Sequence, residues 1–124
     1  CRINSQRLSE IYLAAGAIGC LPFTRASFDD PPALVHSRFF APDDGIPEDP
    51  ATGSAAGSLS AYLVFYGGVP IEPVEGKYSF TIEQGDFMKR PSRINAEITG
   101  ETGEVRRTRV GGQSVVILNG VLEI

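Results

Sequence analysis

The most apolar stretch of the chain is residues 55–66, where nearly every position is hydrophobic or small. Thr52 and Ser54, just before it, are typical N-cap residues, and Gly67 and Gly68 end the pattern. The stretch predicts a helix of about 12 residues, ~18 Å long. Because this helix is apolar on almost every side, we expect the rest of the domain to surround it.

The region before this helix has weaker secondary-structure signals. Asn4 or Ser5 can cap a first helix that Gly16 would end, and residues 18–24 and 34–40 predict two strands. The first helix should lie on the outside of the domain. Its apolar stripe consists of Leu8, Ile11, Tyr12 and Ala15.

The region after the apolar helix has the two-residue period of half-buried strands. Residues 78–84 and 94–98 both alternate apolar with polar side chains, and residues 105–110 follow a turn at 100–104. The last two of these strands should pair as a hairpin.

A second hairpin is predicted at the end of the sequence. Asn119-Gly120 favours a two-residue type I′ turn, and the apolar runs 115–118 and 121–124 flank it. A sheet that covers all sides of a helix must curl until it nearly closes. We therefore expect an α+β fold, in which a curled, barrel-like, mostly antiparallel sheet wraps around a central hydrophobic helix.

Composition indicates one globular domain, residues 1–124, with 42% hydrophobic and 21% charged residues. The net charge of -4 and the absence of a basic stripe argue against nucleic acid or a membrane surface as partner. With no membrane-spanning run and no export signal, we expect a cytoplasmic protein. Cys1, Cys20 and His36 are too few ligands for a structural zinc site, so no metal is predicted.

The loop before the apolar helix is the candidate binding element. Pro47 and Pro50 prevent helix formation, while Gly53 lets the main chain approach a ligand closely. The free N–H groups and positive dipole at a helix N-terminus attract anions. From the loop alone, turn and cap roles are the favoured interpretation of Asp49 and Ser54. The loop contains neither G-x-G-x-x-G nor a P-loop lysine, so nucleotide binding has weak support.

The sequence resembles the C-terminal half of the PhzF-like family of phenazine biosynthesis. Members of that family are similar in fold to diaminopimelate epimerase. They have two pseudo-symmetric halves, each a curled sheet around a central helix, with the ligand site in the cleft between them. The resemblance covers nearly the whole chain. It is carried by Val35-His36-Ser37-Arg38-Phe39-Phe40-Ala41-Pro42, by residues 45–57 (GIPEDPATGSAAG), by Gln84-Gly85, by Arg90-Pro91-Ser92 and by Val110-Gly111-Gly112.

The resemblance implies a cofactor-independent isomerase that transfers a proton on a small carboxylate-bearing substrate. It implies that Asp49 is the catalytic group and that Thr52, Gly53 and Ser54 bind the substrate carboxylate. The epimerases carry a cysteine where Asp49 stands, so a two-thiol mechanism is disfavoured. The family's N-terminal half, with its catalytic glutamate, has no counterpart here, so we expect the chain to bind better than it catalyses.

Its expected partners are a small anionic ligand and either an N-terminal half or a second copy in a homodimer. The alternative is a non-catalytic binding or assembly module that self-associates. Other polar residues have structural interpretations. Glu48 and His36 are expected to be structural, and the arginines after residue 105 are expected to form a solvated strand face.

Overall fold

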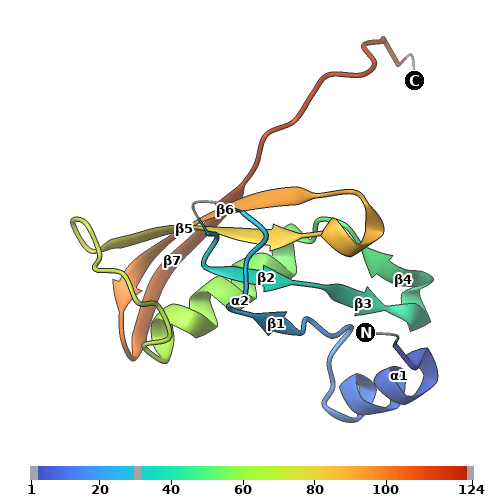
Figure 1. Cartoon of the computed structure of the whole chain (residues 1–124), viewed down its shortest axis with the longest axis horizontal. Coiled ribbons are helices and arrows are strands. Elements are labelled where there is room, and N and C mark those ends of the chain that lie inside the picture. Colours follow the sequence, from blue (N-terminus) through green and yellow to red (C-terminus); the bar gives the residue numbers. More distant parts are fainter. Residues whose placement is uncertain (1–2, 30–31, 123–124) are drawn as a thin grey trace.

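Two α-helices and a five-stranded sheet make up most of the α+β fold (Figure 1). The computed structural model describes residues 3–29 and 32–122. The helices are α1 (Ser5–Ala14) and α2 (Gly53–Phe65), with the short 3-10 helices η1 (Pro42–Asp44) and η2 (Asp86–Met88). The sheet contains β1 (Phe23–Thr24), β2 (Val35–Ser37), β5 (Lys77–Gln84), β6 (Ser92–Glu101) and β7 (Glu104–Gly111), and a separate ribbon pairs β3 (Phe39–Ala41) with β4 (Ile46–Asp49).

The sheet has the strand order β1-β2-β5-β6-β7. Only the β2–β5 pairing is parallel, and the other pairs are antiparallel. The alternating pattern predicted β5 and β6 correctly, and the expected β6–β7 hairpin is confirmed. Ile82 faces Ile94 and Phe80 faces Ala96 across the β5–β6 pair, so one face of these two strands is apolar.

Helix α2 covers that apolar face. Ala56, Leu59 and Leu63 pack with Val35 of β2, Ile82 of β5 and Ile94 of β6 to form the hydrophobic core. The predicted helix is therefore confirmed, but the expected barrel-like sheet around it is not, and the described strands form no closed barrel. Five strands cannot enclose a helix, because a barrel of about eight strands has only enough interior for its own side chains.

The side of α2 that faces away from the sheet is exposed in the described chain. Tyr62 and Tyr66 have exposed fractions of 54% and 67%, and Ser54 and Ser58 are also exposed. The prediction that the sheet wraps around this helix is therefore not confirmed. The sheet buries only one side of the helix, so the apolar residues on its other side face solvent.

Two strand predictions in the first half need correction. The expected strand 34–40 is divided at Arg38 into β2 and β3, because the chain leaves the large sheet there and joins the ribbon. Of the expected strand 18–24, only Phe23–Thr24 is a strand, and Cys20 makes an isolated bridge to Phe40.

Strand β4 was missed because its sequence contains Pro47, which disfavours a strand. It pairs only with β3 among the described strands, and an edge position is where a proline is tolerated.

The first helix forms as predicted. Asn4 caps it by accepting a hydrogen bond from the Arg7 backbone N–H at 3.0 Å, and Gly16 follows its end in a left-handed conformation. Most of α1 is exposed, but Tyr12 is buried and its hydroxyl donates to the Asp43 carboxylate. In the part of the chain that the structure describes, neither α-helix has the length and hydropathy of a membrane span.

The predicted hairpin at the end of the sequence is wrong for the residues that can be assessed. Residues 112–122 contain no strand, and Figure 1 shows this segment extending away from the sheet. Residues 123 and 124, the end of the second predicted strand, lie outside the described residues. An isolated two-stranded hairpin is marginally stable in water, so the turn signal alone does not form one.

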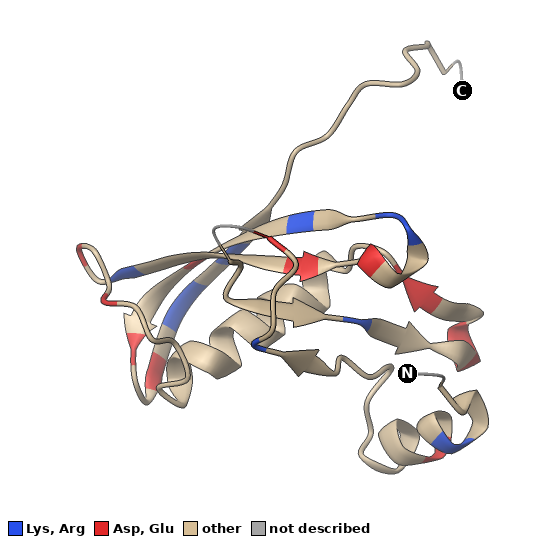
Figure 2. Ribbon diagram, in the orientation of Figure 1, with Lys and Arg blue, Asp and Glu red and all other residues tan. Residues whose placement is uncertain are grey.

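The arginines of β7 are exposed, as expected for solvated residues, and glutamates of β6 and of the start of β7 lie near them (Figure 2). Arg106 contacts Glu104 at 3.0 Å and Glu101 at 3.8 Å, and Arg109 contacts Glu97 at 3.3 Å. Each of these two arginines is therefore paired with a neighbouring glutamate.

Gly85 fixes the position of the loop before α2 against the end of β5. It has a left-handed φ of +85°, and a Cβ there would lie 2.3 Å from the Arg90 carbonyl oxygen and 2.7 Å from that of Pro50. Gly103 has the same φ, but nothing lies within 4 Å of its would-be Cβ.

Substitution of Gly85 by alanine should therefore destabilise the domain more than Gly103→Ala does. Both variants carry the left-handed strain of about 1–2 kcal/mol, and Gly85→Ala adds a backbone clash of similar size or larger. Urea unfolding of both variants measures the difference. Equal losses of unfolding free energy would show that the close approach of Pro50 and Arg90 is not a constraint.

Candidate functional site

The predicted site residues lie together where β4 leads into α2. Asp49 is the last residue of β4, Thr52 is the N-cap position, and Gly53 and Ser54 begin the helix. The Thr52 hydroxyl donates to Asp49 Oδ2 at 2.6 Å and makes no capping bond to the helix. The first turn of α2 therefore has no help from the side chain that normally satisfies its N–H groups.

A buried amide holds this loop in place. Gln84, at the end of β5, is fully buried, and its Nε2 donates to the Asp49 carbonyl oxygen at 2.7 Å and to Thr52 Oγ1 at 2.9 Å. Its Oε1 accepts from the Thr52 backbone N–H at 3.3 Å. Gln84 thus ties the backbone and side chain of the loop to the sheet.

Gln84 belongs to the Gln84-Gly85 motif, but the sequence alone predicted no role for its side chain. The signal was present in the alternation of β5, because Gln84 continues the buried face of Phe80 and Ile82. A polar residue at such a core-facing position must find hydrogen-bond partners. Gln84 therefore belongs either to a binding site or to the structure that supports one.

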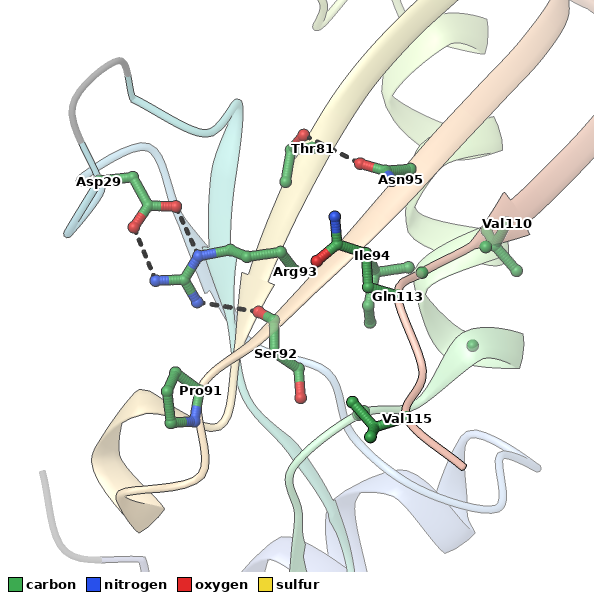
Figure 3. A pocket seen from close by; sticks show the side chains of 14 residues that line it. Asp29, Thr81, Pro91, Ser92, Arg93, Ile94, Asn95, Val110, Gln113 and Val115 are labelled. Atoms are coloured by element: carbon green, nitrogen blue, oxygen red, sulfur yellow. Dashed lines mark hydrogen bonds and ion pairs between the residues drawn. The ribbon is translucent and has the colours of Figure 1, made fainter. Parts of the chain in front are cut away.

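Three hollows meet at the first turn of α2. One of about 870 Å³ is bordered by Gly53, with Asp29 and Arg93 at one side and Gln113 and Val115 at the other (Figure 3). A second, of about 680 Å³, borders Ser54 and is mainly apolar. The third, of about 410 Å³, borders both Gly53 and Ser54. A small ligand can therefore reach the helix N-terminus.

The opposite face of β5 carries a buried carboxylate. Successive strand residues point to opposite faces, so Glu83 lies on the side of the sheet away from Gln84. Glu83 is fully buried and accepts hydrogen bonds from the Ser27 hydroxyl at 2.6 Å and from the Phe28 and Asp29 backbone amides at 3.0 and 2.9 Å. His36 Nδ1 lies 3.0 Å from its Oε2.

These hydrogen bonds decide the charge of Glu83. Burial by itself raises the pKa of a carboxyl group, but the bonds from the 27–29 loop and from His36 outweigh it and lower the pKa of Glu83 to about 2. The carboxylate is therefore ionised at neutral pH, and it anchors the 27–29 loop to the sheet.

His36, Glu83 and Asp86 form a group of possible metal ligands within the described residues. One ligand atom from each lies within 4.8 Å of the others, a set that suits a transition metal by its chemistry. Arg93, however, already bonds Asp86 at 3.0 Å and Asp29 at 2.8 Å, and these carboxylates raise the pKa of its guanidinium. The cluster is therefore an ion-pair network around an arginine. His36 itself is a buried residue of β2, as the sequence indicated.

Glu48 is structural, as expected, and points away from Asp49. It forms a bidentate ion pair with Arg38, with both N–O distances 2.8 Å. This pair braces β4 against the link between β2 and β3.

A solved structure identifies the class of fold. A crystal structure of a PhzF-family phenazine biosynthesis protein from Bacillus anthracis matches with a TM-score of 0.70 and 20% sequence identity. The match covers 90% of this chain and 37% of that one. The domain therefore has the fold of part of a PhzF-family protein.

The family model described as phenazine biosynthesis-like protein (PhzC-PhzF) matches residues 11–120. The chain belongs to this family. It is 38% identical over 92 residues to an uncharacterised isomerase of Mesorhizobium japonicum and 38% identical over 87 residues to the trans-2,3-dihydro-3-hydroxyanthranilate isomerase of Pseudomonas fluorescens. These alignments cover 74% and 69% of this chain, but only 29% of each relative.

The ionised Glu83 makes stability depend on pH. Its folded pKa of about 2 lies below the usual 4.5, so its contribution is fully present above pH 4.5 and is lost as the pH falls toward 2. The shift corresponds to about 3 kcal/mol. Urea unfolding at pH 6, 4 and 3 should show this loss, and Glu83→Gln should remove most of the dependence. The half-exposed Glu97→Gln is the control, and a Glu83→Gln profile that matches the wild type would contradict the assignment.

Proposed function

We propose that this chain supplies one half of the ligand site of a PhzF-like isomerase, which transfers a proton on a small carboxylate-bearing substrate without a cofactor. The supporting observation is the open N-terminus of α2, because the Thr52 hydroxyl bonds to Asp49 and not to the helix. Relatives named as trans-2,3-dihydro-3-hydroxyanthranilate isomerase support the class of substrate, since an anthranilate carries a carboxylate.

Gly53 and Ser54 form the proposed carboxylate cradle. An anion at a helix N-terminus gains about 0.3–1 kcal/mol from the dipole when exposed, and up to ~2 kcal/mol when partly buried. Gly53 has no side chain to obstruct the ligand, and the exposed Ser54 hydroxyl can add a hydrogen bond. Thr52 contributes by keeping its own side chain away from these N–H groups.

Asp49 is the proposed acid-base group on this half of the cleft. Its carboxylate is oriented by Thr52, and its backbone carbonyl is held by Gln84. Proton transfer needs a second group within hydrogen-bond reach of the moving proton. Because the chain spans 29% of the curated relatives named above, we assign that second group to an N-terminal half or to a partner copy.

A non-catalytic binding module is the alternative that the sequence left open. The relatives named as isomerases favour the catalytic proposal over this alternative.

The cradle can be tested with the 124-residue chain by NMR titration with sulfate, acetate and benzoate. We expect the amide signals of Gly53 and Ser54 to shift, and Ser54→Ala to weaken binding about 10- to 100-fold, because one hydrogen bond to a charged group is lost. Ser58→Ala is the matched control, since the Ser58 hydroxyl donates to the Ser54 carbonyl within the helix. Equal affinities of the two variants, or shifts elsewhere only, would refute the cradle.

The role of Asp49 can be tested in a chimera, in which this chain replaces the matching segment of the Pseudomonas fluorescens isomerase. Deuterium incorporation from D₂O into trans-2,3-dihydro-3-hydroxyanthranilate reports proton transfer. Asp49→Asn should slow it about 10²- to 10⁴-fold, the usual contribution of a general acid or base. Asp44→Asn, on the exposed η1 turn, is the control. A normal rate in the Asp49 variant would exclude the catalytic role and leave the cradle unaffected.

A further inference from the structure

Thr52 has the properties of a helix cap but does not cap its helix. It occupies the N-cap position of α2, and threonine is among the residues favoured there. Its backbone, with a φ of -110° and a ψ of 92°, has the extended conformation that is usual for a cap. Because the backbone is already in place, rotation about χ1 is the change that capping requires. Another contact must therefore hold the Thr52 hydroxyl where it is.

The side-chain amide of Gln84 has an orientation that backbone groups fix. The Asp49 carbonyl oxygen can only accept a hydrogen bond, so the side-chain atom 2.7 Å from it is the nitrogen Nε2. The Thr52 backbone N–H can only donate, so the side-chain atom 3.3 Å from it is the oxygen Oε1. Gln84 is fully buried, and these two contacts together allow its amide one orientation.

This orientation determines what the Thr52 hydroxyl can do. Gln84 Nε2 has a second N–H, which faces Thr52 Oγ1 at 2.9 Å, so the hydroxyl oxygen accepts from Gln84. The hydroxyl has a single proton, and that proton goes to Asp49 Oδ2 at 2.6 Å. The hydrogen bonds therefore run in one direction, from Gln84 to Thr52 and from Thr52 to Asp49.

We propose that Gln84 is a positioning residue of the ligand site, which keeps the N-terminus of α2 open by holding the Thr52 hydroxyl away from it. A hydroxyl oxygen that caps a helix must accept from an N–H group of the first turn. The Thr52 oxygen accepts from Gln84 instead, and its proton is bound to Asp49. Without the Gln84 amide, the Thr52 hydroxyl turns to the helix and caps it.

A Thr52 cap would occupy N–H groups that the proposed carboxylate cradle uses. A cap accepts from the second or third residue of its helix, and in α2 these residues are Ser54 and Ala55. Ser54 is also one of the two cradle residues, so a Thr52 cap and a carboxylate ligand are alternatives. This effect on ligand binding rests on the proposed function, whereas the effect of Gln84 on capping does not.

Amide hydrogen exchange of the 124-residue chain, measured by NMR, tests the proposal without a ligand. In Gln84→Met the helix should gain the Thr52 cap, so exchange at Ser54 or Ala55 should slow about 2- to 30-fold, the range for one threonine cap. Loss of a residue that only supports the loop would have the opposite effect, because the loop would open more often. Faster or unchanged exchange at both amides would overturn the proposal.

Ser37→Ala is the control for a general loss of stability. It also removes a hydrogen bond of a buried side chain, from Ser37 Oγ to the Glu83 carbonyl oxygen at 3.1 Å, but Ser37 lies in β2 and outside the loop. Exchange at Ser54 and Ala55 should not slow in this variant. Slower exchange in Ser37→Ala as well would show that the effect is not specific to Gln84.

A second measurement decides the proposal even if Gln84→Met does not fold. The two Nε2 protons of Gln84 have different acceptors, the Asp49 carbonyl oxygen and the Thr52 hydroxyl oxygen. Replacement of the hydroxyl in Thr52→Val should therefore move the NMR signal of one proton and leave the other in place. If neither signal moves, the Thr52 hydroxyl is not held by Gln84, and the proposal is wrong.

Titration with sulfate, acetate and benzoate shows whether the cap competes with a ligand. Gln84→Met should weaken acetate binding about 2- to 30-fold, because the ligand must displace the cap. In a Thr52→Val background no cap can form, so Gln84→Met should change the affinity less than about twofold. Equal weakening in both backgrounds would mean that Gln84 acts only through loop stability, which contradicts the proposal. If the wild type binds none of these anions, the proposed cradle fails, and the exchange experiment alone decides the role of Gln84.

Discussion

The buried amide of Gln84 is the interaction on which the candidate site depends. It satisfies the carbonyl of Asp49, the hydroxyl of Thr52 and the backbone N–H of Thr52 at once, and Gln84 itself is fully buried. An unpaired polar group at such a place costs about 1–3 kcal/mol, so the loop has one favoured position. Because Thr52 is held toward Asp49, the helix N-terminus is left open to a ligand.

The two faces of β5 carry polar side chains that make different contacts. Gln84 supports the loop before α2 on one side of the sheet, while its neighbour Glu83 anchors the 27–29 loop and His36 on the other side. The parallel pairing with β2 places His36 directly beside Glu83 in the register. A short segment at the end of one strand thus connects the core, the candidate site and the ion-pair network.

Helix α2 is apolar on nearly all sides but is covered on only one. Its buried side packs on β2, β5 and β6, and its other side presents Tyr62, Phe65 and Tyr66 to solvent. A helix that is apolar all round is normally buried. In the described chain, this side of α2 and the aliphatic residues after β7 are therefore two hydrophobic surfaces that no described element covers.

The sequence by itself determined the local structure of this protein. Caps, glycine stops and alternating side chains predicted α1, α2, β5 and the β6–β7 hairpin, because these signals act over a few residues. The motif before α2 also indicated Asp49, Thr52, Gly53 and Ser54 as one group. The tertiary structure alone decided how far the sheet extends around the helix, where the strand at 34–40 divides, and which groups Gln84 and Glu83 bind. The His36–Glu83 contact joins residues 47 positions apart, and no local pattern encodes such a pairing. The hairpin predicted at the end of the sequence did not form, because a turn signal produces paired strands only where another surface buries them.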